Sequence, residues 1–494
     1  MNVTKSQCPY CGVGCGLKMR PKNSVSDDKW LVSGDRDTPS TLGKLCVKGA
    51  TVCETLKNGR LKEPLYRKNL NEEFKKISWD ESYKILKENI LSSIKNHGPD
   101  SIAMYGSGQF HTEDYYIAQK LLKGAIGTNN FDANSRLCMS SAVAGYNRSF
   151  GSDGPPCCYE DIDHCSSIFL IGTNTAECHP VLFDRIKKRK RNVNDNLKVI
   201  VIDPRETETA SIADFYLQIA SGTDLFLFIG IANYLYKNKL TEQNFIEKST
   251  ENYDHFVKHI QTWDLKKISE ICNISKQAII DIAKLWGESK NVLSLWSMGL
   301  NQRQEGTATV NGLINLHLMT GQLGKAGAGP FSLTGQPNAM GGREAGGLSH
   351  LLPGYRFVKN KIDRNEIEKI WGFPIGKISE KQGLSAWEQI EAINKGTVKI
   401  WWIAATNPLV SMPNLNFVKK ALLKCPFIIL NESYEQSESI KFAHLVLPAA
   451  QWSEKDGVMT NSERRVSLCP SFRESNKNLK PDWQIFAELG QKIG

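Results

Sequence analysis

Four cysteines within the first fifty residues constrain this chain more than any other feature. Cys8, Cys11 and Cys15 lie in the segment CPYCGVGCG, and Cys46 follows in the segment LCVKG. Three thiolates on one tight loop can hold three corners of an iron–sulfur cube, and a distant fourth thiolate completes it. The intervening glycines allow the backbone to turn closely around such a cluster. The spacing therefore predicts a [4Fe–4S] cluster on these four cysteines.

Zinc and disulfide bonds are the alternatives for these thiols. Zinc sites usually take their ligands from two Cys-x-x-Cys pairs, and this segment contains only one. The chain has 13 cysteines, and no apolar export segment follows Met1. We therefore expect reduced thiols in a cytoplasmic protein. A redox cluster also implies that a further group in the protein receives or supplies electrons.

Composition excludes several classes of protein. The chain has 494 residues, of which 40% are hydrophobic and 23% charged, as in globular proteins of several domains. The sequence contains no apolar run long enough for a membrane helix. A net charge of +10 suits an acidic protein partner or an anionic substrate. The densest basic run, 187–191, contains no aromatic residue, so nucleic-acid binding is not expected.

Short apolar segments alternate with helical patterns, and this alternation predicts an α/β fold with parallel sheets covered on both faces. Helices are expected at 80–96, with Asp80 as the N-cap, and at 114–126. The expected strands are 101–105, 167–172, 197–202, 215–219, 292–296, 398–404 and 427–430.

Polar and glycine-containing segments follow most of these strands, where parallel sheets bind ligands. One group of such segments precedes Gln302 and another follows Ala404, so two related nucleotide-binding units are expected. The glycine-rich region 321–347 between them has the length of a functional loop. No Gly-x-Gly-x-x-Gly fingerprint occurs, which argues against an ordinary nicotinamide site. From its context alone, Cys138 is either a ligand or nucleophile, or a buried small hydrophobe.

The chain resembles the molybdenum bis-(molybdopterin guanine dinucleotide) oxidoreductases, and within them the catalytic subunits of cytoplasmic assimilatory nitrate reductases. The likeness runs along essentially the whole chain. It is carried by the two cysteine segments and by RLCMSSAVAGY, GSDGPPCCYEDI, GTNTAECHP, VIDPRETETA, MGLNQ, GPFSLTGQPNAMGGREAGG, ATNPLVSMPN and NESY.

The resemblance implies a role for each matching position. Cys138 would give the protein thiolate to molybdenum, and Lys48 would lie between the cluster and one pterin. Met139 and Arg343 would belong to the substrate funnel, although Arg343 is equally expected to pair with a phosphate or a structural carboxylate. The positions that would hold the two guanine dinucleotides are Lys48, Gln109, Asn134, Gly172, Asn174, Glu177, His179, Asp203, Thr207, Asp224, Met298, Gln302, Gln336, Asn407 and Asn431.

The resemblance also implies an architecture and a reaction. A small iron–sulfur domain (1–61) would precede two interleaved, doubly wound (Rossmann-like) dinucleotide-binding units, 137–330 and 62–136 with about 331–494. The C-terminal barrel domain of the family is expected to be missing. The expected reaction is reduction of nitrate to nitrite by oxygen-atom transfer to Mo(IV), with electrons passing singly through the cluster. The positive net charge, rather than the resemblance, would suit acidic ferredoxin or flavodoxin as the electron donor, with a flavoprotein reductase subunit as the alternative.

Three alternatives remain open at this level. A formate dehydrogenase of the same superfamily resembles the chain, but that family places histidine after the metal-binding residue, where this chain has Met139. A periplasmic nitrate reductase is similar too, and the lack of an export segment argues against it. A non-catalytic iron–sulfur relay subunit would not need Cys138 together with the full set of pterin-binding positions.

Overall fold

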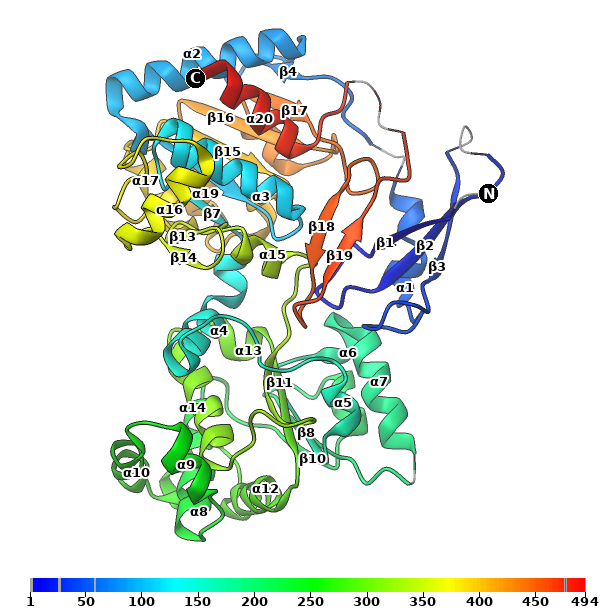
Figure 1. Cartoon of the computed structure of the whole chain (residues 1–494), viewed down its shortest axis with the longest axis vertical. Helices are drawn as coiled ribbons and strands as arrows, with labels where there is room; N and C mark the ends of the chain where they lie inside the picture. The colour runs from blue at the N-terminus through cyan, green and yellow to red at the C-terminus, as the bar shows by residue number, and fades with distance from the viewer. Residues whose placement is uncertain are drawn as a thin grey trace.

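A computed structural model describes residues 3–24, 28–56, 59–192, 194–474, 476 and 478–493; residues 1 and 494, at the outer limits of the predicted domains, lie outside them. The described chain is α/β, as predicted. It forms two lobes, each built on its own mainly parallel sheet, with a small N-terminal unit beside them (Figure 1). In the described residues, no helix is both long and apolar enough to cross a bilayer.

The N-terminal unit is a three-stranded antiparallel sheet followed by two single helical turns. Its strands are β1 (Thr4–Gln7), β2 (Gly16–Pro21) and β3 (Trp30–Gly34). The turns are α1 (Val47–Ala50) and the 3-10 turn η1 (Val52–Thr55). The loop between β1 and β2 holds the first three predicted cluster cysteines, and the fourth immediately precedes α1.

The lower lobe in Figure 1 is built on a five-stranded parallel sheet with the order β10-β9-β8-β11-β12. These strands are β8 (Ser167–Ile171), β9 (Lys198–Ile202), β10 (Phe215–Leu217), β11 (Val292–Trp296) and β12 (Gly329–Ser332). The strand order reverses between β8 and β11, and a doubly wound sheet opens its ligand crevice at that point.

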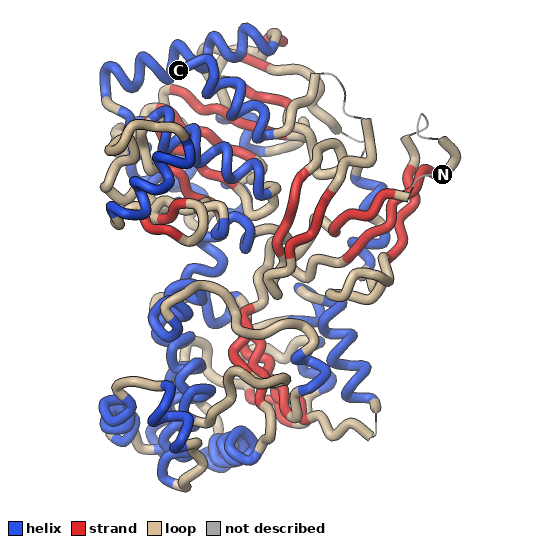
Figure 2. The backbone as a smooth tube through the Cα atoms, viewed as in Figure 1, coloured by secondary structure: helices blue, strands red, loops and turns tan. Residues whose placement is uncertain are grey.

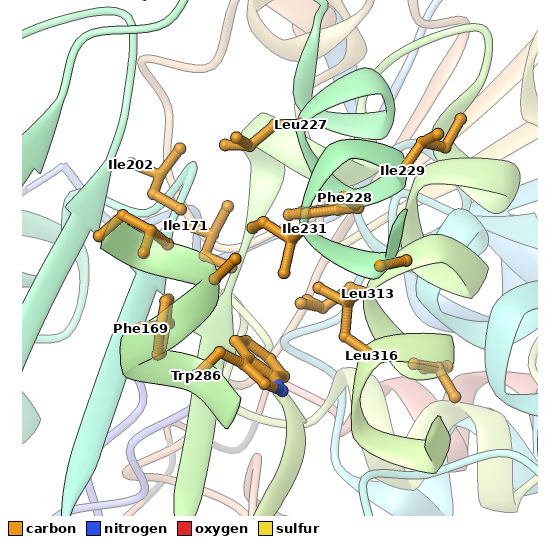
Figure 3. Packing of buried hydrophobic residues seen from close by; sticks show 14 of the residues in the cluster. Phe169, Ile171, Ile202, Leu227, Phe228, Ile229, Ile231, Trp286, Leu313 and Leu316 are labelled. Atoms are coloured by element: carbon orange, nitrogen blue, oxygen red, sulfur yellow. The ribbon is translucent and has the colours of Figure 1, made fainter. Parts of the chain in front are cut away.

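Helices cover this sheet and bury its apolar faces. Figure 3 shows Phe169 of β8 beside Trp286 of α12 in this core, and their ring centres are 4.7 Å apart. The helices of the lobe are α4 (Ser135–Phe150), α5 (Asp161–His164), α6 (Thr175–Cys178), α7 (Pro180–Arg191), α8 (Asp224–Lys237), α9 (Gln243–Ser249), α10 (Tyr253–Gln261), α11 (Leu265–Cys272), α12 (Lys276–Glu288), α13 (Met298–Asn301) and α14 (Gly306–Met319).

The upper lobe is built on a seven-stranded sheet with the order β5-β4-β17-β16-β15-β6-β7. Only β4 and β5 run antiparallel to their neighbours. The strands are β4 (Leu65–Tyr66), β5 (Lys75–Lys76), β6 (Ile102–Gly106), β7 (Phe131–Ala133), β15 (Ile400–Ala404), β16 (Phe427–Glu432) and β17 (Leu445–Pro448). The remaining helices are α2 (Trp79–His97), α3 (Thr112–Gln119), α15 (Ala339–Glu344), α16 (Lys361–Trp371), α17 (Ala386–Asn394), α18 (Pro408–Ser411), α19 (Leu415–Leu422) and α20 (Asp482–Ile493).

Two of the predicted helices differ in detail from the structure. The N-cap of α2 is Ser78, not Asp80, because Ser78 and Glu81 form a capping box. The helix predicted at 114–126 continues α3 as a π-helical segment over Lys120–Ile126. Lys123 in that segment is completely buried and donates to the carbonyl of Leu348, which follows the glycine-rich loop, at 2.9 Å. Bulges of this kind often occur near functional sites.

The chain crosses between the lobes at two places that matter for the site. It passes from β7 directly into α4, and it returns from β12 to α15 through the segment 333–338. Two short hairpins complete the fold: β13 (Leu351–Leu352) with β14 (Arg356–Phe357), and β18 (Gly457–Thr460) with β19 (Val466–Cys469). The β18–β19 hairpin extends alongside the N-terminal sheet (Figure 2).

Candidate functional site

The structure brings the four predicted cluster cysteines together. The amide of Cys8 donates to the carbonyl of Cys15 at 2.8 Å and closes the loop that carries Cys11. Burial raises the pKa of Cys8 to about 12, and the nearby thiols of Cys11 and Cys46 raise it further. The pKa of Cys15 is likewise raised, first by burial and then by the other three thiols. Four mutually interacting thiols fit the corners of an iron–sulfur cube.

The alternatives gain no support from this geometry. All thirteen cysteines lie in the described residues and are free thiols. Among the residues that the structure describes, no three His, Cys, Asp or Glu side chains converge as ligands of a single ion. In an iron–sulfur cluster each thiolate binds a different iron atom, so neighbouring thiols that do not converge on a single ion are compatible with a cluster.

Lys48 is an exposed residue of α1, two residues after Cys46. The charge of its ammonium group lowers the pKa of Cys8 and Cys11, against the larger effect of burial, which raises it. The same charge lowers the pKa of His179, in the same direction as burial. His179 itself is buried, and its Nε2 lies 3.0 Å from the carbonyl of Thr334. Lys48 is therefore between the cluster loop and the turn that follows β8.

Cys138 lies on the first turn of α4, close to both lobe crossings. Its sulfur is 3.5 Å from the sulfur of Met298, and a Cβ added at Gly335 would lie 3.8 Å from it. Burial raises the pKa of the Cys138 thiol, while the amide of Gly335 and the charge of Arg343 act in the opposite direction. The thiol therefore faces polar and soft groups, as a metal-binding thiol does.

Arg343 is held by a carboxylate on the other lobe. It is 2% exposed, and its Nη1 donates to Oδ1 of Asp153 at 3.0 Å. Of the roles expected for Arg343, pairing with a structural carboxylate is therefore the one seen in this structure. One polar atom of each partner, Arg343 Nε and Asp153 Oδ2, is buried and has no hydrogen-bond partner among the described residues. A buried guanidinium with an unused donor near Cys138 can still meet a small anion.

The expectation that Met139 lines a substrate funnel finds no support in this arrangement. The side chain is 1% exposed and packs in the hydrophobic core of the lower lobe. Its sulfur accepts a hydrogen bond from Nδ2 of Asn301 at 3.2 Å. Adjacent residues of an α-helix point in different directions, and Cys138 is only half-buried and packs at the margin of the same core.

The positions expected to hold one dinucleotide follow the strands of the lower sheet. Gly172, at the end of β8, has a φ of +53°, and the Cα of Gly299 lies so close that any side chain at 172 would clash. This contact occurs where the strand order reverses. The other positions at this edge are Asn174, Glu177 and His179 after β8, Asp203 and Thr207 after β9, Asp224 after β10, and Met298 and Gln302 after β11.

Polar groups at this edge are only partly satisfied. The Oγ1 of Thr207 is buried and has no hydrogen-bond partner in the described part of the chain. Asp224 is buried, which raises its pKa, and it pairs with Arg303, whose Nε also has no partner there. Unsatisfied buried donors and acceptors are expected where a polar ligand binds. Arg303 was not predicted as a site residue, because it lies one residue beyond the recognised MGLNQ segment.

A second group of predicted positions lines a cavity of about 570 Å³ at the edge of the upper sheet. It opens where the strand order reverses between β6 and β15. The predicted residues on its wall are Gln109, Asn134, Gln336, Asn407 and Asn431. The side chain of Asn134 accepts from the amide of Gly108 at 2.8 Å and so joins the loop after β6 to the start of α4.

A buried cluster of three charged residues was not predicted, and two of them, Lys455 and Asp482, lie on the same wall. Lys455 donates to Asp482 at 3.0 Å and to Asp114 at 2.6 Å, and Asp482 accepts from Asn431 at 3.0 Å. Lys455 lies in the segment after β17 (Leu445–Pro448), a strand that was not predicted, so the pattern of polar residues after strands did not indicate it. These groups fix the position of Asn431 in the cavity wall.

The comparisons with known proteins agree with this geometry. Residues 60–492 match the model of the Molybdopterin oxidoreductase family, and residues 1–58 match the Molybdopterin oxidoreductase Fe4S4 domain. The chain is 52% identical to a nitrate reductase of Synechocystis sp. over 100% of its length and 69% of the relative's length. It is 40% identical to the periplasmic nitrate reductase of Desulfovibrio desulfuricans, over 99% of this chain and 66% of the relative.

Two further proteins complete the comparison. The assimilatory nitrate reductase catalytic subunit of Bacillus subtilis is 36% identical over 99% of this chain and 68% of its own length. The fold is similar to that of acetylene hydratase from Pelobacter acetylenicus, with a TM-score of 0.81 and 19% identity over 99% of this chain and 69% of that one. The chain thus spans about two thirds of the length of these proteins.

The chain therefore belongs to the molybdopterin oxidoreductase family. The predicted fold class and the two predicted cofactor classes, a molybdenum–molybdopterin group and a [4Fe–4S] cluster, are confirmed by the matching family models. Two features fit these groups: the four neighbouring thiols of the N-terminal unit, and the polar side chains at the strand ends, some of which lack hydrogen-bond partners in the described part of the chain.

Proposed function

We propose that this chain is the catalytic region of a nitrate reductase that binds a bis-(molybdopterin guanine dinucleotide) cofactor. The observation that carries the proposal is the convergence of Cys138 and Arg343 at the crossing between the lobes, in a chain 52% identical to a nitrate reductase along its whole length. The domain boundaries predicted above, 1–61, 62–136 with about 331–494, and 137–330, are part of this proposal.

In this proposal each group of residues has its own role. Cys8, Cys11, Cys15 and Cys46 hold the cluster, and Cys138 holds the metal. The metal centre supplies the two-electron, oxygen-accepting chemistry that no side chain has.

The two dinucleotides would be held at the two sheet edges. One lies against the turns after β8 to β11, and the other lies in the cavity lined by Gln109, Asn134, Gln336, Asn407 and Asn431. The polar side chains at both edges offer hydrogen bonds to bases and riboses.

Arg343 orients the substrate anion in this scheme. Its pairing with Asp153 makes the pair neutral overall and fixes the guanidinium plane, so a small anion meets a directed donor rather than a free positive charge. Met139 acts from the core as packing behind Cys138.

The electron donor in this proposal is an acidic one-electron carrier such as ferredoxin or flavodoxin, with a flavoprotein reductase subunit as the alternative. Lys44 and Lys48 are exposed on either side of Cys46, and the net charge of the chain is +10. Binding to ferredoxin should weaken steeply as salt rises, because the attraction is between exposed charges. Reduction that does not change with salt would favour the reductase subunit. A cytoplasmic location stays a prediction.

The decisive experiment compares nitrate and formate as substrates of the holoenzyme under anaerobic conditions. Reduced viologen should be oxidised on addition of nitrate, and oxidised viologen should not be reduced on addition of formate. Cys138→Ala should lower nitrate turnover by at least about 100-fold. Cys272→Ala, in the core of the same lobe, is the control and should leave turnover close to normal.

Two outcomes would contradict the proposal. Formate oxidation without nitrate reduction would assign the chain to the formate dehydrogenases of the same family. A protein that contains iron but no molybdenum would be an electron relay. Metal analysis of the same preparation separates these outcomes.

A further inference from the structure

The peptide group of Gly12 forms a junction between three parts of the protein. Gly12 lies in the loop of the cluster cysteines, and its amide donates to the carbonyl of Gly335 at 2.9 Å. Its carbonyl accepts from the amide of Ser462 at 2.8 Å and from the hydroxyl of Tyr159 at 2.9 Å. A Cβ at position 12 would lie 2.0 Å from the carbonyl oxygen of Thr334, so only glycine fits.

Gly335 continues this junction to Cys138. Its carbonyl receives the hydrogen bond from Gly12, and its own amide faces the Cys138 sulfur. The backbone of two glycines therefore joins the peptide that follows Cys11 to the sulfur of Cys138. Electrons tunnel more readily through covalent and hydrogen bonds than across a gap of the same length.

We propose that the Gly12–Gly335 contact is a direct electron route from the iron–sulfur cluster to the Cys138 thiolate, one that does not pass through a pterin. The route rests on the proposed function, which supplies the cluster and the metal at its two ends. One electron would pass from the cluster held by Cys8, Cys11, Cys15 and Cys46 to the metal held by Cys138. No covalent bond forms or breaks, and no proton moves along the route.

Tyr159 is the positioning residue of this route. Its ring is completely buried and stacks on Phe331 of β12, with the ring centres 5.8 Å apart. Its hydroxyl holds Gly12, and its amide donates to the buried carboxylate of Glu463 at 2.9 Å. Tyr159 thus contacts both the strand that leads to Gly335 and the cluster loop, and it fixes their separation.

The test uses Tyr159→Phe, which removes the hydroxyl and keeps the stacked ring. Tyr146→Phe is the matched control. Tyr146 is also completely buried, and its hydroxyl bonds to the backbone of β12 at Pro330 and Ser332, without contact to the cluster loop. Both variants lose one buried hydroxyl from the same region, so their effects on stability should be similar.

The measurement is the rate of electron transfer within the holoenzyme. The holoenzyme is reduced with dithionite and viologen and then mixed with nitrate, which reoxidises the metal centre. The oxidation of the cluster by that centre is followed by rapid-freeze EPR. Tyr159→Phe should slow this transfer by about tenfold, while Tyr146→Phe should leave it within about twofold of normal. Amide hydrogen exchange of residues 8–15 should become faster in Tyr159→Phe alone.

Three results would overturn the route. The first is equal transfer rates in Tyr159→Phe and the unmodified enzyme. The second is a slower rate fully explained by a change in the cluster's midpoint potential, measured by EPR titration, because the driving force would then be the cause. If Tyr159→Phe loses iron, Ser462→Ala replaces it. This change keeps the amide bond to Gly12 but removes the hydrogen bond from the Ser462 hydroxyl to the carbonyl of Thr334, the residue before Gly335, at 3.0 Å. Unchanged transfer in that variant is the third result. An unmodified protein without a cluster signal or without molybdenum overturns the proposed function itself.

Discussion

Arg343 and Asp153 form a buried ion pair across the two lobes, with 3.0 Å between Nη1 and Oδ1 and side chains that are 2% and 4% exposed. Removing one member leaves a buried charge uncompensated, which costs about 3–5 kcal/mol. Asp153→Leu and Arg343→Met should therefore each lower the free energy of unfolding by that amount.

The double variant separates the structural role of this pair from its role with substrate. Asp153→Leu combined with Arg343→Met should recover most of the lost stability in urea denaturation, because neither charge remains buried. The double variant should not reduce nitrate, because no guanidinium would donate a hydrogen bond to the substrate anion. Recovered turnover in the double variant would show that Arg343 only supports the fold.

Cys46 and Cys53 provide a matched test of the cluster ligands. Both are half-buried thiols of the N-terminal unit, but the pKa of Cys53, raised to about 11 by burial, is not affected by any other thiol. Cys46→Ser should lose most of the roughly four iron atoms per chain, and Cys53→Ser should keep them. Iron analysis together with the EPR signal of the reduced cluster is the measurement. Loss of iron in both variants would indicate damage to the unit rather than loss of a ligand.

The charge of Lys48 should stabilise the reduced cluster, which carries one more negative charge than the oxidised form. Lys48→Gln should therefore lower the midpoint potential of the cluster, by about 30 mV for an exposed interaction. Lys44→Gln is the control, since Lys44 is exposed on the same segment and alters the pKa of none of these thiols. Equal shifts in the two variants, read by EPR titration, would mean that only net charge matters.

His317 should make the protein less stable in acid. It is buried between the hydroxyl of Ser294 and the carbonyl of Gln322, and burial lowers its pKa from 6.5 to about 3. As pH falls below 6.5, the unfolded chain binds a proton that the folded chain does not. Stability is therefore full above pH 6.5 and is lost progressively toward pH 3, by about 2 kcal/mol at pH 5.

Replacing His317 tests this pH dependence directly. His317→Gln should lower stability at pH 7 but reduce the difference between pH 7 and pH 5 by about 2 kcal/mol in urea denaturation. His255→Gln, at an exposed position of α10, should leave that difference unchanged. An undiminished difference in His317→Gln would show that the titration of other groups causes the acid instability.

The sequence predicted β6, β8, β9, β10, β11, β15 and β16, because each is a short, largely apolar run, but not the other strands of the two large sheets. The prediction of 292–296 coincides with β11. The start of α2 was wrong by two residues, because Asp80 and Ser78 are both good N-caps and only the reciprocal bonds with Glu81 decide between them. The π-helical end of α3 had no local signal, since it depends on a buried contact of Lys123 with distant carbonyls.

The sequence by itself determined the family, the fold class and the cofactor classes, because these depend on local patterns: cysteine spacing, apolar runs and the polar residues that end each strand. Only the tertiary structure decided what Arg343 and Met139 contact and how Gly12, Gly335 and Cys138 connect. Asp153 lies 190 residues before Arg343 in the chain, and Gly335 is similarly remote from both of its partners. Contacts between such distant residues arise from the packing of the lobes, and no local pattern records them.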